Sequence, residues 1–203
     1  MTRRNCFYVF HGTTEHNALN IKQSKAFTNK MREDHWLGQG VYFFREDERQ
    51  AFCWAKYKIK NLFLRGQKPA VVETIIKVGD LNFLNLDSRE GLITLSNFID
   101  SLKLQGICIE YDSTGKNIRD IKAKIRCFIM SMLPPDIWVI QRTFHVPSFF
   151  DNTVLSNMNL LLNGVQVCVR NCNVINFENI KIIRDVAKAR VIDNIIIKEC
   201  EEA

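Results

Sequence analysis

The chain has 203 residues and a net charge of +6, from 28 Lys and Arg against 22 Asp and Glu. Hydrophobic residues make up 46% and charged residues 25%. That balance argues against a disordered chain and is typical of a globular protein, so we expect a single domain over residues 1–203. No apolar stretch is long enough to span a membrane, and we expect no secretion signal, because the charged N-terminus is not followed by the apolar core region of one. We therefore expect a cytoplasmic protein without membrane contact.

The seven cysteines include no C-x-x-C pair and no H-E-x-x-H element accompanies them. Metal sites usually show such closely spaced Cys or His ligands. The cysteine spacing therefore favours free thiols in a reducing compartment, and we expect no bound metal.

The first predicted element is a strand over Cys6–Phe10, which is rich in aromatic and β-branched residues. A helix is predicted to follow it, with Ala18 and Ile21 on its apolar face. Thr13 or Thr14 would cap the N-terminus of that helix, because a hydroxyl oxygen there accepts a hydrogen bond from a free backbone N–H.

The remaining predicted elements follow without a regular rhythm. Strands are predicted over residues 40–44, 70–78, 106–111, 136–144, 165–169 and 191–198, and helices over residues 47–66, 91–104 and 119–133. An even βαβ alternation would indicate a parallel sheet, and this order lacks it. We therefore expect an α+β fold with a mixed, mostly antiparallel sheet and flanking helices.

Two short elements point to a binding site. The first is His11, Gly12 and Thr13 between the first strand and the following helix, where glycine permits close approach of a ligand and histidine adds a directed hydrogen bond. The second comprises Gly38, Gly40 and Tyr42, in which two glycines precede a strand with an aromatic residue that could stack on a flat heterocycle. Each element taken alone is also typical of an ordinary structural turn.

The order of the two elements resembles the ADP-ribosyltransferase superfamily, especially its His-Tyr branch, which includes the poly-ADP-ribose polymerases. The resemblance covers Tyr8–Tyr57, about a quarter of the chain. It implies a split β-sheet core and transfer of ADP-ribose from NAD, the co-substrate, with release of nicotinamide. The acceptor would be a macromolecule, either protein or nucleic acid. A toxin or phage-defence context, with an antitoxin or other regulatory protein as partner, is expected by analogy.

The resemblance also assigns roles to residues. His11 would hold a ribose hydroxyl on the adenosine side, the backbone of Gly12 would hold the nicotinamide carboxamide, and Tyr42 would stack on the nicotinamide ring. Thr13 and Gly40 match the surroundings of these motifs and would shape the pocket.

The third position of the family is normally a glutamate at the start of a late strand, and the best match here is Gln166. A glutamine keeps a hydrogen bond to the ribose but lacks the charge that stabilises an oxocarbenium-like transition state. Either the reaction is slower, the acceptor brings its own base, another acid such as Glu178 or Glu110 takes the role, or the protein only binds. An ordinary solvated position for Gln166 fits almost as well.

Two other functions stay open. The RNA 2'-phosphotransferases share the expected fold and the His-Gly-Thr element, but their His-x-His element is matched here by the single residue His35. A non-catalytic module that binds NAD or ADP-ribose is the other alternative, and Gln166 favours it.

The opening of the NAD pocket is predicted from two polar segments. We expect Thr28–Gln39 and Pro147–Asn163 to form this opening and to be mobile, because both are long and polar.

Overall fold

The structure is a computed structural model that describes residues 4–64, 66–107, 118–145 and 163–185. The strands are β1 (Arg4–Thr14), β2 (Val41–Arg45), β3 (Pro69–Gly79), β4 (Phe83–Asn85), β5 (Val139–His145), β6 (Asn163–Val169) and β7 (Lys181–Ile183). The helices are α1 (Glu15–Ser24), α2 (Glu48–Asn61), α3 (Arg89–Leu104) and α4 (Ile118–Met132). The strand predicted over 191–198, most of that over 106–111 and nearly all of the predicted loop Pro147–Asn163 lie outside the described residues.

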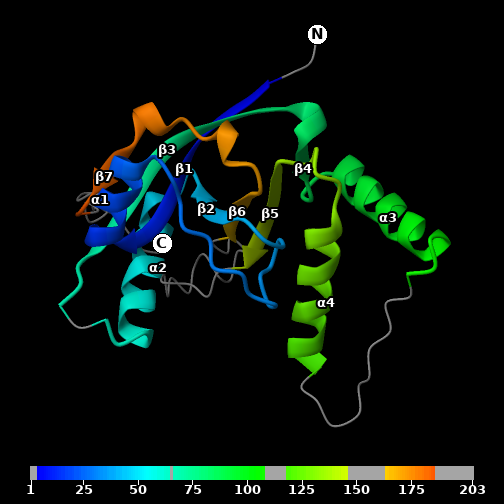
Figure 1. The fold of residues 1–203 in the computed structure, drawn as a ribbon, viewed down its shortest axis with the longest axis horizontal. Coiled ribbons are helices and arrows are strands. Elements are labelled where there is room, and N and C mark those ends of the chain that lie inside the picture. Colours follow the sequence, from blue (N-terminus) through cyan, green and yellow to red (C-terminus); the bar gives the residue numbers. More distant parts are fainter. Residues whose placement is uncertain (1–3, 65, 108–117, 146–162, 186–203) are drawn as a thin grey trace, which may run out of the picture.

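The strands form one seven-stranded sheet in the order β4-β5-β6-β2-β1-β3-β7 (Figure 1). Every neighbouring pair is antiparallel except β4 and β5, which run parallel with Phe83 opposite Val139. The expected α+β class with a mixed, mostly antiparallel sheet is therefore confirmed. The strands β4 and β7 were missed, because three residues are too few to show a periodicity.

Helices α1 and α2 lie on opposite faces of the sheet, which we call the α1 face and the α2 face. On the α1 face, Ala18 and Ile21 of α1 pack with Ala70 and Val72 of β3. The main cluster on that face contains Phe7, Val9, Val41, Phe43, Ile76, Val78, Val139, Val167 and Val169. Alternation along each strand sends every second side chain to the same face, so this face contains the largest part of the core.

Two clusters cover the α2 face. Ala51 of α2 packs against Phe10, Phe44 and Val71. At the other half of the sheet, α4 contributes Met130 to a cluster that also contains Leu37, Leu84, Leu86, Leu133, Ile140 and Cys168. On this face α2 lies over β1 and β3, whereas α4 packs against Ile140 of β5 and Cys168 of β6.

The helix starts follow the expected capping chemistry. Thr14, rather than Thr13, caps α1 by accepting a hydrogen bond from the backbone N–H of Asn17 at 3.2 Å. Asp47 caps α2 by accepting from Gln50 N at 2.9 Å.

The end of α2 differs from the prediction, which extended the helix to residue 66. The helix ends at Asn61, and Leu62 and Phe63 beyond it are 58% and 83% exposed. Phe63 takes a left-handed backbone conformation with φ of 49°, so the chain has already left the helix that packs on the sheet. Among the described residues, no helix is both long and apolar enough to cross a membrane.

Candidate functional site

The ladder between β1 and β2 opens at the residues that the sequence singled out. The two strands pair at Val9↔Arg45 and Phe10↔Phe44, and the ladder of the described residues goes no further. On its other side, β1 stays paired with β3 as far as Thr14↔Pro69. Residues 11–13 of β1 and 41–43 of β2 therefore face each other without ladder pairing, and we call this gap the β1–β2 opening.

Gly12 directs its backbone groups toward this opening. The carbonyl oxygen of Tyr8 accepts a hydrogen bond from Glu46 N at 3.1 Å, so Tyr8 points its backbone groups at the β2 side. In an extended strand the backbone N–H and C=O groups of every second residue point to the same side, so those of Phe10 and Gly12 also point toward β2. The N–H and C=O of Gly12 therefore lie at the opening, where the β1–β2 ladder offers no partner.

His11 lies inside β1, on the α1 face, and not at a strand–helix boundary as predicted. The reason is that β1 stays paired with β3 through Thr14, so the strand continues past the His-Gly-Thr element. The imidazole packs edge-on against Phe27 and Phe43, with ring centroids 5.3 and 5.7 Å away.

The imidazole of His11 spans the β1–β2 opening. Its Nδ1 lies 2.8 Å from the carbonyl oxygen of Tyr42. Because a carbonyl oxygen only accepts, Nδ1 donates, and Nε2 is left as an acceptor in the neutral ring. Burial, opposed by the hydrogen bond to Tyr42 and aided by the charge of Lys58, lowers the pKa of His11 to about 4, so the ring is neutral at pH 7.

This depressed pKa predicts a loss of stability in mild acid. The unfolded chain takes up a proton at His11 near pH 6.5, whereas the folded chain does so only near pH 4. Between these values the unfolded state binds more protons, so the free energy of unfolding falls as the pH falls, by about 2–3 kcal/mol. Urea unfolding at pH 7, 5.5 and 4 measures this loss.

The matched variant is His11→Gln, which keeps an N–H donor for the carbonyl of Tyr42 but does not titrate. The gap, defined as the unfolding free energy of wild type minus that of His11→Gln, should decrease as the pH falls from 7 to 4. A gap that stays constant over that range would contradict the assignment of the low pKa to His11.

The side chain of Tyr42 lies on the α2 face, opposite to His11. Its hydroxyl accepts from Leu37 N at 2.7 Å and donates to Gly38 O at 2.7 Å. Burial raises the pKa of Tyr42 above its usual value of 10. The ring of His35 lies against it with centroids 5.1 Å apart. Tyr42 therefore anchors the segment before β2, and its backbone carbonyl rather than its ring contacts His11.

The three glycines of the two elements permit close packing. A Cβ on Gly12 would lie 2.0 Å from the backbone oxygen of Ala51 in α2. A Cβ on Gly40 would lie 2.6 Å from the Sγ of Cys168 in β6, and a Cβ on Gly38 would lie 2.9 Å from the backbone carbon of Met130 in α4. Gly12 is therefore required for the packing of α2 on the sheet, whatever ligand its backbone binds.

Gln166 and Thr13 lie close to the opening on different faces. Gln166 of β6 stands opposite Phe44 of β2 and Arg142 of β5, on the same face as Tyr42. Its half-buried side chain makes no hydrogen bond to any described residue. Thr13 is buried, and alternation places it on the α1 face with His11. The geometry thus brings Gln166 and Tyr42 to one face and His11 and Thr13 to the other.

The alternative acid Glu178 does not lie beside Gln166. Its carboxylate pairs with Lys25 at 2.5 Å, and its neighbour Phe177 lies tilted against Phe27, which contacts His11. Glu178 is therefore on the α1 face, and Glu110 lies outside the described residues.

Positive charge collects near the opening. The pKa of Lys58 in α2 is lowered, first by burial and then by the nearby charges of Lys30 and Arg32. The charge of Lys58 in turn lowers the pKa of His11. The charges of one cation on α2 and of two on the segment between α1 and β2 thus act on one another, and Arg32 among them is paired with Asp34. Like charges repel one another, and an anion between them would relieve that repulsion.

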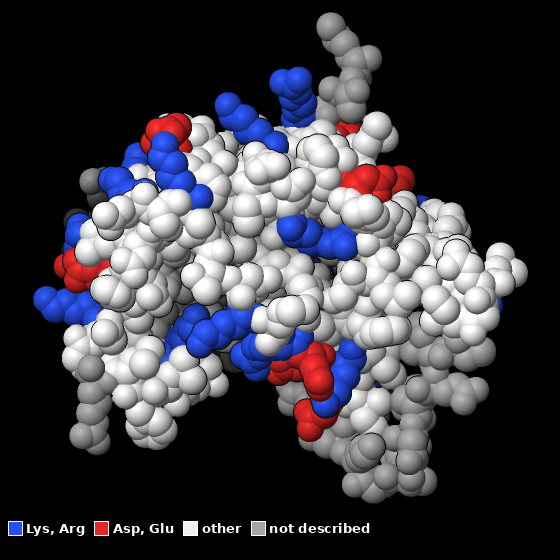
Figure 2. Space-filling view, in the orientation of Figure 1, with Lys and Arg blue, Asp and Glu red and all other residues white. Residues whose placement is uncertain are grey.

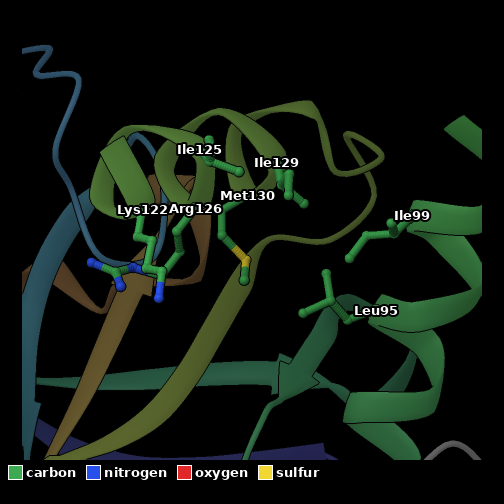
Figure 3. Close-up of a pocket in the computed structure, with 7 residues that line it drawn as sticks. All are labelled: Leu95, Ile99, Lys122, Ile125, Arg126, Ile129 and Met130. Carbon is green, nitrogen blue, oxygen red and sulfur yellow. The ribbon is translucent and has the colours of Figure 1, made fainter. Parts of the chain in front are cut away.

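The two hollows described lie beside α4 and not at the opening. One is an apolar groove of about 340 Å³, in which Leu95 and Ile99 of α3 face Ile125, Ile129 and Met130 of α4 (Figure 3). The other is a polar crevice of about 800 Å³ between residues 32–36 and α4. Neither is lined by His11, Gly12 or Tyr42. No group of three or more His, Cys, Asp or Glu in the described chain is arranged to hold a metal ion.

Sequence reasoning missed Lys58 and Lys30, and it attached no role to Trp36 or Arg126. One signal for Lys58 was present in the sequence. Lys58 follows Ala51 and Ala55 at helical spacing, and so it lies on the side of α2 that faces the sheet. Arg170 donates to the backbone oxygens of Leu133, Pro134 and Ile137 and so caps the C-terminus of α4.

Comparison with known proteins adds one relative. A 53-residue stretch is 43% identical to an uncharacterized protein of Methanocaldococcus jannaschii, covering 26% of this chain and 24% of the relative. The match thus spans about a quarter of the length of that relative. No family model matches the chain. No solved structure matches it either.

Proposed function

We propose that the chain binds NAD at the β1–β2 opening and transfers its ADP-ribose to a macromolecular acceptor. The observation that carries this proposal is the opening itself, where the backbone of Gly12 and a neutral His11 lie together. An unpaired strand edge exposes fixed donors and acceptors, which is how proteins recognise an amide or a hydroxyl group.

The groups at the opening suit the parts of a nicotinamide dinucleotide. The peptide groups of Gly12 offer one donor and one acceptor, which complement the carbonyl and amino groups of the nicotinamide carboxamide. The Nε2 of His11 accepts, so a ribose hydroxyl is a fitting partner for it. Lys58, Lys30 and Arg32 supply the positive charge that a pyrophosphate needs.

The role of Tyr42 in this proposal is partly structural. Its hydroxyl is already held by Leu37 and Gly38, so the ring cannot turn freely toward a ligand. Stacking on nicotinamide would use the ring as it stands, after His35 moves aside. Tyr42→Ala would therefore disturb the segment before β2 as well as ligand binding, and His11 is the better residue to test.

The test is release of nicotinamide from NAD by wild type and by His11→Gln. We expect release by wild type and a loss of at least about tenfold in the variant, because glutamine does not reproduce the acceptor nitrogen of the imidazole. The matched control is His16→Gln on the exposed surface of α1, where the imidazole contacts only Asn20 among the described residues. This control should keep the wild-type rate.

Each alternative function gives a different result in the same assay. Binding of NAD without nicotinamide release would indicate the non-catalytic module. Consumption of NAD that depends on an RNA bearing a 2'-phosphate would indicate the RNA 2'-phosphotransferase. Equal release by wild type and His11→Gln would overturn the proposed site.

A further inference from the structure

The polar crevice beside α4 has two unlike walls. Residues 32–36 form one wall with Arg32, Glu33, Asp34 and Trp36, and α4 forms the other with Asp120, Lys122, Ala123, Lys124 and Arg126. Its volume of about 800 Å³ falls within the range of sites that hold small molecules. The crevice is therefore large enough for a nucleotide.

Trp36 provides a flat aromatic surface in this crevice. Its side chain is 41% exposed, although it is one of the largest apolar groups of the chain. The ring meets Phe144 of β5 edge-on with centroids 4.3 Å apart, and the guanidinium of Arg126 lies 5.2 Å from the ring centre. These contacts hold the indole in place while leaving part of it open, which suits stacking of a planar base.

Arg126 carries an unused hydrogen-bond donor. Its Nε is buried and has no hydrogen-bond partner within the described residues. A buried donor without a partner is costly, and a guanidinium beside solvent commonly pairs with a phosphate. Lys122 lies one turn earlier on α4, and the two side chains leave the helix on the same side (Figure 3).

The charges of the crevice leave a positive surplus. Arg32 is paired with Asp34 at 2.9 Å and Lys124 with Glu33 at 2.7 Å. Lys122, Arg126 and Asp120 take part in no ion pair of the described chain, so the surplus is one positive charge. The same region appears in Figure 2 as a group of basic and acidic side chains at the lower centre of the molecule.

The crevice also lies next to the proposed NAD site. Arg32 lines the crevice and is one of the charges that act on Lys58 near the β1–β2 opening. The ring of His35, the neighbour of Trp36, lies tilted against the ring of Tyr42. A ligand held on Trp36 would therefore be close to the opening.

We propose that this crevice binds single-stranded nucleic acid, with a base stacked on Trp36 and its phosphates on Lys122 and Arg126, and that this strand is the acceptor of ADP-ribose. The acceptor role rests on the proposed function, whereas the binding does not. A duplex is excluded from this mode because its bases are already stacked and paired.

The experiment measures binding of fluorescein-labelled ten-nucleotide strands, DNA and RNA in separate arms, by anisotropy without NAD. Trp36→Ala should weaken binding about tenfold, whereas Trp36→Phe, which keeps a stacking ring, should stay within about threefold of wild type. The matched control is Trp54→Ala on α2, since Trp54 is 48% exposed and stacks on Tyr57 away from the crevice. Trp54→Ala should bind as wild type does.

The charge part of the proposal has its own readout. Lys122→Ala and Arg126→Ala should each reduce the dependence of log Kd on log salt by about one phosphate contact. The control is Lys103→Ala on α3, where the lysine is exposed and paired with Asp100. Lys103→Ala should leave the salt dependence unchanged.

Three results would overturn the proposal: no binding of either strand by wild type, equal binding of a duplex or of polyglutamate, or equal losses in Trp36→Ala and Trp54→Ala. Nicotinamide release is measured in parallel on the same variants and should be unchanged without the strand. Strand binding by a protein that releases no nicotinamide would remove the acceptor role and the proposed function but keep the crevice as a nucleic-acid site.

Discussion

Replacing Gly12 with alanine should lower the free energy of unfolding by about 3 kcal/mol or more, the upper range for overpacking in a core. The new Cβ would lie 2.0 Å from the backbone oxygen of Ala51 and 3.2 Å from the backbone nitrogen of Ala55. Both atoms belong to the main chain of α2, so no side chain can move aside. The whole helix must shift from the sheet. Urea unfolding at pH 7 measures the loss.

The control for Gly12 is Gly79→Ala at the end of β3. There the nearest atom is the side-chain oxygen of Asn82, 3.7 Å from the new Cβ, and φ is −74°, which alanine adopts without strain. Alanine at position 79 should leave stability within about 1 kcal/mol of wild type. Equal unfolding midpoints for wild type and Gly12→Ala would show that α2 does not pack on β1 as described.

Replacing Gln166 with glutamate should raise the release of nicotinamide in the absence of an acceptor. If the position faces the developing oxocarbenium ion, a unit charge about 4 Å away contributes roughly 4 kcal/mol, or about three decades in rate. An increase of tenfold to a thousandfold is therefore expected. Arg142 stands opposite Gln166 on β5 and favours the ionised form of the new carboxyl group.

Gln166→Ala is the companion variant and should lower nicotinamide release more than tenfold, because it removes a hydrogen bond to the ribose at the reacting end. Gln67→Glu, which adds the same charge in an exposed segment between α2 and β3, is the control and should not change the rate. If Gln166 is merely solvated, both Gln166 variants will match wild type, and the third position of the proposed site will be wrong.

Local sequence predicted most elements because their signals are short-range. The apolar run at Cys6–Phe10 forms the middle of β1, and Asp47 caps α2 through an oxygen that reaches Gln50 three residues later. The α+β class followed from the order of such elements. Strands β4 and β7 had no local signal, because each is defined by its pairing with a distant strand, Phe83 with Val139 and Val71 with Ile183.

The role of Gly12 illustrates what sequence leaves open. A glycine after a strand indicates that something approaches the backbone, and both a ligand and a helix satisfy that requirement. The fold brings Ala51 of α2 against one side of Gly12, while the strand alternation turns its backbone groups to the β1–β2 opening. Only the tertiary structure shows that Gly12 has both surroundings, since residues 12 and 51 meet only when α2 packs on the sheet.

The sequence by itself determined which residues belong together near the candidate site, namely His11 and Gly12 on one strand and Tyr42 on the next. Tertiary structure decided how they meet, through the carbonyl of Tyr42 rather than its ring, because the register sets Tyr42 opposite Gly12, and side chains alternate between faces along a strand, so His11 and Tyr42 point to opposite faces. Tertiary structure also decided which charged side chains lie around these residues. Lys58 comes from α2, whereas Lys30 and Arg32 come from the segment before β2, and charges act through space, so chain order could not reveal that these charges influence one another.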